Sequence, residues 1–309
     1  MTRSKLLAVP LALLLVACSA EEPAPRAGSA GRVRIDLHDW AGYRATAAVL
    51  AHLLRKELGY EVSFRESAEK DSWARFESGE VDVIVENWGH EDLKKEYIDR
   101  KKVALSAGLN GNKGVIGWYI PQWMAGAYPG ISDWRNLNKH ANLFRTAKSG
   151  NFGQVLDGDP SFVTNDESIV KNLDLNYRVV YSGSEDALIK AALDATKNRK
   201  PLLMYFYEPQ WLFTKVKLVK VNLPPYAIGC DADAAKVACD YPPYLLDKIV
   251  STRFAREGGK AYELVRNFTW SNDHQNAVAG DIVAGLTPEQ AAEKWVEENK
   301  IVWKDWMPR

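Results

Sequence analysis

Short strand-like runs alternate with helical patterns along most of this chain, and no other sequence feature limits the possible folds so strongly. Residues 33–37 alternate apolar and polar side chains as strands do, and residues 45–58 carry Leu and Ala at helical spacing before Gly59. Residues 60–64 and 81–85 are the next strand candidates. Such a rhythm predicts an α/β sheet covered by helices.

The same rhythm returns further along the chain. Helices are expected at 167–173 and 185–197, and strands at 115–120, 142–146, 177–181 and 202–206. From Tyr244 onward the pattern is mostly helical. At this length, two α/β lobes that share one continuous chain fit better than a single large core.

The N-terminal residues predict export. Two basic residues precede an apolar run at 6–17, which is typical of a signal peptide and shorter than the ~20 residues that span a bilayer. The run ends in Leu15-Val16-Ala17-Cys18, which resembles the lipobox of bacterial lipoproteins. The resemblance implies that residues 1–18 are a signal peptide ending at a lipidated Cys18. Residues 19–31 are small, polar and rich in Pro and Gly, and we expect a flexible tether there.

The charges of the chain balance. Forty basic and forty acidic side chains cancel, so no strong field is available to attract nucleic acid or anionic lipid. We therefore expect no nucleic-acid partner and no membrane contact beyond the lipid anchor. We also expect a monomer that carries no cofactor and no metal.

With Cys18 assigned to the anchor, Cys230 and Cys239 remain. Two thiols close in sequence and exposed to an oxidising compartment most simply form a disulfide. A metal site or a redox pair is the alternative, but the spacing is not Cys-x-x-Cys and no His lies nearby. Asp231 and Asp233 inside the loop lack the Gly and the terminal Glu of an EF-hand, so a solvated turn is the simpler interpretation.

Aromatic residues follow several of the expected strands. Trp40 follows the first strand, Trp88 follows 81–85, Trp118 and Tyr119 lie at the end of 115–120, and Tyr207 follows 202–206. Ligands of open α/β sheets bind beyond the carboxyl ends of the strands, so these rings are expected to share one cleft. Aromatic faces attract a trimethylammonium group, which has no N–H donor and carries a diffuse charge.

The sequence resembles the glycine betaine, choline and carnitine substrate-binding proteins of ABC importers. The resemblance runs from about Val33 to about Leu286. It rests on Trp40, on the runs ELGYEV (57–62) and SGEVDVIVENW (78–88), and later on GSEDALIKAALDA (183–195) and RKPLLMYFYEP (199–209). It implies a two-lobed, periplasmic-binding-protein-like (type II) α/β fold with a ligand cleft between the lobes.

By this resemblance, Trp40, Trp88, Tyr207 and either Trp118 or Tyr119 form an aromatic cage for a quaternary-ammonium head, with glycine betaine as the leading ligand. Adjacent strand residues point to opposite faces, so the choice between Trp118 and Tyr119 stays open. His38 and His90 lie close in sequence to two cage residues and are further candidate contacts.

The segment after 142–146 falls where relatives bind the polar end of the ligand. Its Gly residues allow backbone N–H groups to approach a carboxylate, and the candidate contacts are Asn151, Phe152, Gly153 and Gln154. Some choline-selective relatives carry an acidic residue two positions after the first cage Trp. Gly42 stands there in this chain, which favours a zwitterion over choline. Choline, carnitine and proline betaine remain alternatives.

The resemblance also implies the division into lobes and the partners. Residues 32–118 and 208–309 would form lobe 1 and residues 119–207 lobe 2, and the partner would be an ABC importer permease with its ATPase. A sensory binding protein with the same fold is a rival that the fold alone does not exclude. An enzyme is disfavoured because the five His residues are dispersed and match no catalytic motif.

Overall fold

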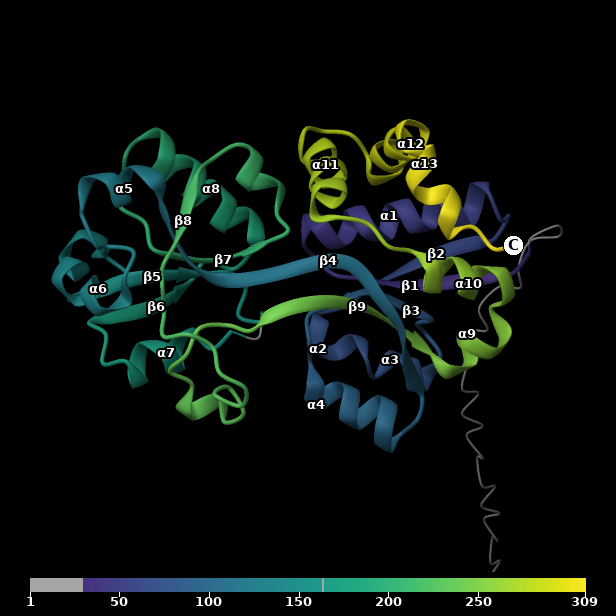
Figure 1. The fold of residues 1–309 in the computed structure, drawn as a ribbon, viewed down its shortest axis with the longest axis horizontal. Helices are drawn as coiled ribbons and strands as arrows, with labels where there is room; N and C mark the ends of the chain where they lie inside the picture. Colours follow the sequence, from purple (N-terminus) through teal and green to yellow (C-terminus); the bar gives the residue numbers. More distant parts are fainter. Residues whose placement is uncertain (1–29, 163) are drawn as a thin grey trace, which may run out of the picture.

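The computed structural model describes residues 30–309 except residue 163. The expected signal peptide, the lipidated Cys18 and nearly all of the tether therefore lie outside the described residues. A single mixed sheet runs through the molecule in the strand order β2-β1-β3-β9-β4-β7-β5-β6, and β8 pairs with β4 beside this path. Two lobes lie at the ends of this sheet, joined by β4 and β9 (Figure 1).

The first lobe is built on parallel pairing of β1 with β2 and with β3. These strands are Arg32–Leu37, Glu61–Glu66 and Val83–Asn87. Helix α1 (Ala41–Lys56) crosses between β1 and β2, and its Ala- and Leu-rich face is buried against the sheet and against α11 and α12. This βαβ unit confirms the alternation seen in the sequence.

The second lobe carries β5 (Gly153–Asp157), β6 (Tyr177–Tyr181), β7 (Met204–Glu208) and β8 (Leu218–Lys220). Strand β5 is parallel to both β6 and β7, whereas β4 is antiparallel to β7. Helix α8 (Glu185–Lys197) connects β6 to β7, and its N-terminus is capped by the Ser184 hydroxyl. The two-lobed α/β fold is thereby confirmed.

The other elements are short. In the first lobe they are α2 (Glu69–Ser72), α3 (Arg75–Ser78), α4 (Glu91–Lys94), the π-helical turn Lys95–Arg100, α9 (Thr252–Glu257), α10 (Gly259–Asn267), α11 (Asn272–Val283), α12 (Pro288–Glu298), α13 (Lys300–Trp303) and the 3-10 turn Lys304–Trp306. In the second they are α5 (Gln122–Ala127), α6 (Trp134–His140), α7 (Asp166–Asn172) and the 3-10 turns Ala141–Phe144, Trp211–Thr214 and Ala234–Lys236.

Two long strands form the connection between the lobes. Strand β4 (Ala104–Pro121) pairs with β9 (Pro243–Ser251) in the first lobe and at the crossing, and with β7 and β8 in the second. Residues 218–240 pack on the second lobe, since β8 pairs with β4 and Asn172 of α7 donates to the Val237 carbonyl. The return crossing therefore lies in β9, later than the position near Glu208 that the sequence suggests.

One expected strand is wrong. Residues 142–146 form most of a 3-10 turn and a single bridge from Arg145 to Gly153 rather than a strand. By contrast, the predicted disulfide is confirmed, with Cys230 and Cys239 bonded and their Cα atoms 6.4 Å apart. Helix α12 begins directly after Thr287, whose side chain forms a reciprocal capping box with that of Gln290.

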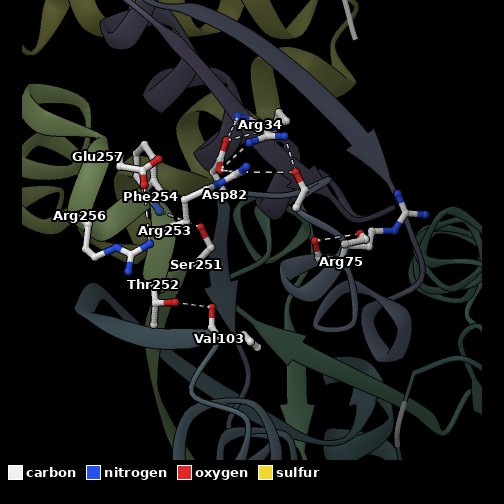
Figure 2. Close-up of polar contacts among 12 residues, drawn as sticks. Arg34, Arg75, Asp82, Val103, Ser251, Thr252, Arg253, Phe254, Arg256 and Glu257 are labelled. Carbon is white, nitrogen blue, oxygen red and sulfur yellow. Dashed lines mark hydrogen bonds and ion pairs between the residues drawn. The ribbon is translucent and has the colours of Figure 1, made fainter. Parts of the chain in front are cut away.

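A buried carboxylate joins strand β1 to helix α9, which directly follows β9 in the first lobe. Asp82, 2% exposed, lies between Arg34 of β1 and Arg253 of α9 (Figure 2). The Arg34 Nε is 2.9 Å from Asp82 Oδ2, and the Arg253 Nη2 is 2.8 Å from Asp82 Oδ1. Because both carboxylate oxygens accept from guanidinium groups, the charge is compensated where water is excluded. These contacts hold the end of β9 that lies in the first lobe.

Candidate ligand-binding site

A cavity lies where the carboxyl ends of strands from both lobes meet. Trp40 precedes α1 and Trp88 follows β3 in the first lobe, whereas Tyr205 and Tyr207 belong to β7 in the second. Strand ends converge on this point because parallel strands present their carboxyl ends at one edge of a sheet. The lining residues are Trp40, Glu69, Trp88, His90, Ile116, Phe162, Tyr205, Tyr207 and Tyr244.

A single buried carboxylate orients the two Trp rings of the first lobe. The Nε1 groups of Trp40 and Trp88 lie 3.2 Å and 2.8 Å from Oε1 of Glu86, and both donate to it. Glu86 is fully buried, and burial raises its pKa although the two indole donors favour its ionised form. With both N–H groups turned toward Glu86, the ring faces are left to line the cavity.

The Tyr rings of the second lobe lie on one face of β7. Tyr205 and Tyr207 are two residues apart, so their side chains point the same way. The ring centroids of Trp88 and Tyr207 are 5.6 Å apart with the planes at 77°, and those of Trp88 and Tyr244 are 5.8 Å apart at 61°. The Tyr207 hydroxyl donates to Glu185, which holds this ring in place. Edge-to-face contacts of this kind fix the walls of a cavity.

Phe162 closes the cavity from the second lobe. Its ring centroid lies 6.4 Å from that of Trp40, and the two planes are nearly perpendicular at 88°. Phe162 follows β5, and Trp40 follows β1. The two lobes therefore contact each other directly through rings that line the cavity, so the cavity is complete only when the lobes are together.

One polar pair lies in the aromatic wall. The His90 Nε2 is 2.8 Å from Oε1 of Glu69. Burial opposes charge on both groups, but the hydrogen bond and the mutual attraction outweigh it: they lower the pKa of Glu69 below 4.5 and raise the pKa of His90 above 6.5. Within the described residues, the hydroxyls of Tyr205 and Tyr244 have no hydrogen-bond partner, so they are available to a ligand oxygen.

The predicted Trp118 does not line the cavity, and neither does Tyr119. In the antiparallel pairing of β4 with β7, Trp118 lies opposite Tyr205, and Ile116 lies opposite Tyr207. Trp118 therefore shares the cavity face of the sheet but sits too far into the second lobe, where its Nε1 donates to Asp166 at 2.8 Å. Tyr119 faces the other side and packs on Phe213, with the ring centroids 5.4 Å apart.

The structure does not bring the segment of Asn151, Phe152, Gly153 and Gln154 to the cavity. Gly153 is the first residue of β5, and the cavity lies beyond the other end of that strand, ~13 Å away for a strand of this length. Asn151 and Phe152 are exposed, Arg178 stacks over the Phe152 ring, and Gln154 accepts from the Thr146 hydroxyl. The position expected to hold the polar end of a ligand is thus on an outer surface.

The two candidate His residues line different cavities. His90 lines the aromatic cavity, whereas His38 lines a neighbouring polar cavity between the lobes and packs on Trp40 at a centroid distance of 4.9 Å. Gly42, the position at which some relatives carry an acidic residue, is buried in α1, and a side chain there would collide with the amide of Gln275. The acidic residue at the wall of this cavity is Glu69 instead.

Sequence reasoning missed Tyr205, Tyr244, Phe162, Glu69 and Ile116. Tyr205 could have been found, because residues two apart on a strand share a face and Tyr207 was already a candidate. Phe162 and Glu69 follow the carboxyl ends of β5 and β2, where ligand contacts are expected. Tyr244 carries no local signal, since only the pairing of β9 with β4 brings it to Trp88.

Residues 30–309, without 163, contain no group of three His, Cys, Asp or Glu side chains arranged to hold a metal ion. The same residues include no helix with the length and apolar character needed to cross a membrane.

A cavity walled by aromatic rings, completed by two lobes joined through a pair of strands, defines a bilobal substrate-binding protein. The chain belongs to the family described as the substrate binding domain of ABC-type glycine betaine transport systems, whose model matches residues 31–298. Proteins of this family bind small molecules outside the cytoplasm and deliver them to ABC transporters, so the family favours a binding protein over an enzyme.

Individual relatives agree with this assignment. A trimethylamine N-oxide-binding protein of Pelagibacter ubique is 26% identical over 325 residues, which cover 97% of this chain and 98% of that protein. Lactococcal OpuAC, closed and complexed with glycine betaine, superposes with a TM-score of 0.71 at 22% identity, covering 90% of this chain and 100% of that one. A choline-binding protein in complex with choline gives a TM-score of 0.71 at 20% identity, with coverage of 89% and 91%.

Proposed function

We propose that this protein captures a small methylated-ammonium compound, with glycine betaine as the first candidate, and that the aromatic cavity holds its onium head. The observation that carries the proposal is the meeting of Trp40 and Trp88 of one lobe with Phe162, Tyr205 and Tyr207 of the other around one cavity. Each ring face can attract the cation by about 0.5–2 kcal/mol. Several rings together account for a large part of the ~8 kcal/mol of micromolar binding.

The polar groups of the wall support a ligand that also carries an oxygen. The hydroxyls of Tyr205 and Tyr244 and the imidazole of His90 are donors that a carboxylate or an N-oxide could use. Trimethylamine N-oxide is the second candidate, because the relative named for it aligns over nearly the whole chain. Choline, carnitine and proline betaine are further candidates, and for choline the Glu69 carboxylate would serve as an acceptor.

Delivery would follow closure of the lobes. Ligand would enter the open cleft, meet the rings of one lobe and draw the other lobe around the onium, as hinge closure does in similar binders. In this proposal Cys18 carries a lipid that holds the protein at the outer face of a bacterial membrane, and the protein acts as a monomer. The closed form would dock on the permease, whose ATPase drives release.

Calorimetry with the purified protein tests the ligand class. Glycine betaine, trimethylamine N-oxide, choline, carnitine and proline betaine are titrated in parallel, and intrinsic Trp fluorescence is followed in the same samples. At least one compound should bind with micromolar or tighter affinity and change the fluorescence, because Trp40 and Trp88 line the cavity. No heat and no fluorescence change with any of the five would contradict the proposal.

A genetic test separates import from sensing. Deletion of the gene alone should abolish uptake of the labelled ligand that binds best in calorimetry. Normal uptake, together with a lost transcriptional response to that ligand, would support the sensory alternative instead.

A further inference from the structure

Glu185 is the first residue of α8, in the second lobe, and its carboxylate is almost completely buried. The side chain is 4% exposed and lines the polar cavity that adjoins the aromatic one. Burial raises the pKa of Glu185, so its hydrogen-bond partners matter for keeping the ionised form there. A carboxylate in such a position needs a structural or functional reason.

The two oxygens of this carboxylate reach different lobes. Oε1 accepts from the hydroxyl of Tyr207 and from Nε2 of Gln210 at 2.6 Å, and both donors belong to the second lobe. Oε2 accepts from the backbone N–H of Ala41 at 3.0 Å, and Ala41 opens α1 in the first lobe. One side chain thus connects a ring of the cavity with the residue that directly follows Trp40.

The N-terminus of α1 lacks a partner of its own. Its N-cap residue is Trp40, which makes no side-chain capping bond, and the first turn holds no acidic residue. The first N–H groups of a helix have no intrahelical acceptor, and the helix dipole favours an anion beside them. Glu185 supplies this anion from across the cleft. When the lobes separate, the Ala41 N–H must lose the bond.

We propose that Glu185 is a positioning residue that holds the lobes closed, by joining the α1 N-terminus of one lobe to the cavity residue Tyr207 of the other. The inference rests on the proposed function in that the cavity is taken as the ligand site. The carboxylate holds Tyr207 within its own lobe, and it holds Trp40 of the other lobe through the neighbouring Ala41. The same group therefore positions the cavity walls and makes the contact that closes the lobes. Loss of the bond should mainly speed ligand release, since dissociation requires opening.

Two variants remove the contact from opposite sides. In Glu185→Gln the single acceptor oxygen cannot serve both Tyr207 and Ala41. Ala41→Pro deletes only the donor, because Pro is well accepted at the first position of a helix. The preceding Trp40 is extended, at φ −137° and ψ 150°, as a residue before Pro must be. The matched control is Asp186→Asn, the same charge change at an exposed position of the same helical turn.

Stopped-flow fluorescence with the best ligand of the calorimetric panel measures the effect. We expect both Glu185→Gln and Ala41→Pro to raise the dissociation rate about tenfold, with the association rate within about twofold of the parent, whereas Asp186→Asn stays at the parent values. Tenfold corresponds to about 1.4 kcal/mol. In the double variant the Ala41→Pro substitution should add nothing further, because its partner is already lost.

Small-angle scattering with and without ligand keeps this test separate from the ligand assignment. The two variants should have a larger radius of gyration than the parent protein and the control under the same conditions, whatever compound the cavity takes. If no compound binds the parent protein, the proposed function fails while the scattering comparison still decides the role of Glu185. Full additivity of the two substitutions, or unchanged release and unchanged scattering in Ala41→Pro, would overturn the inference.

Discussion

The imidazole of His90 lies 2.8 Å from the carboxylate of Glu69, and the two side chains form the charged part of an otherwise aromatic wall. Both are largely buried, with side-chain exposures of 14% and 13%. His90 has a positive φ of 48°, a backbone conformation that Asn also tolerates. The pair can therefore be tested by His90→Asn with little disturbance of the chain.

The stability contributed by this pair should depend on pH. The pKa of His90 is raised above 6.5 in the folded state, so its contribution is fully present below pH 6.5 and is lost as pH rises through the folded value. The pKa of Glu69 is lowered below 4.5, so its contribution is present above pH 4.5 and is lost as pH falls through the folded value. The nearby charges of Asp92 and Lys94 act on His90 in opposite directions and more weakly.

Urea unfolding at pH 5.5 and 8.5 checks this prediction. The difference in unfolding free energy between the parent protein and His90→Asn should be larger at pH 5.5 than at pH 8.5, because the raised pKa of His90 stabilises the fold only while the imidazole is protonated. A difference that does not change between the two pH values would show that the pair is not ionised as proposed.

Trp88 should carry a measurable share of ligand affinity. Replacing it by Ala removes a ring that lines the cavity and contacts Tyr207 and Tyr244, so we expect the Kd to rise about 5- to 30-fold, or about 1–2 kcal/mol. Trp88→Phe keeps a ring face but loses the bond to Glu86, and its loss should be smaller. Calorimetry gives both values. Trp123→Ala in α5, away from the cavity, is the control, and equal affinities of the Trp88→Ala and control proteins would remove Trp88 from the site.

Trp118 should matter for stability rather than for binding. Its Nε1 donates to the buried Asp166, and Phe at this position would leave that carboxyl with one donor fewer. A lost partner of a buried polar group costs about 1–3 kcal/mol, so the unfolding free energy of Trp118→Phe should fall by that amount. The Kd of the folded variant should stay within about twofold of the parent value. A large loss of affinity at unchanged stability would return Trp118 to the cage.

The buried carboxyl group of Asp166 should make the stability of the fold depend on pH in a second way. Burial raises the pKa of Asp166, and the charge of the neighbouring Asp157 raises it further. Between the ordinary carboxyl value and the raised one, the folded state holds a proton that the unfolded state has released, so stability falls as pH rises. Asp166→Asn keeps an acceptor for Trp118 and Tyr241 without titrating.

Thermal unfolding at pH 5, 7 and 9 compares the two proteins. The Tm of the parent protein should decline over this range, and that of Asp166→Asn should decline less. Part of the slope should remain in the variant, because burial also raises the pKa of Asp157, to about 6. Parallel curves would contradict the assignment of the proton to Asp166.

The sequence by itself determined the class of fold and part of the cavity. The spacing of apolar residues within a single segment shows which face of that strand or helix is buried. This signal is local, so it can be seen in the sequence. Trp40, Trp88 and Tyr207 were found for the same reason, since Trp40 and Trp88 follow β1 and β3 and Tyr207 lies near the carboxyl end of β7. The disulfide followed from two Cys residues with a separation of 9.

Only the tertiary structure decided which of the other rings reach the ligand site. Whether Ile116 or Trp118 lies beside the cavity depends on the register between β4 and β7, and Tyr244 depends on the pairing of β9 with β4. The bond from Ala41 to Glu185 joins residues 144 positions apart. Register and lobe placement arise from the packing of the whole sheet, in which each strand contributes a small part of the energy, so no local pattern encodes them.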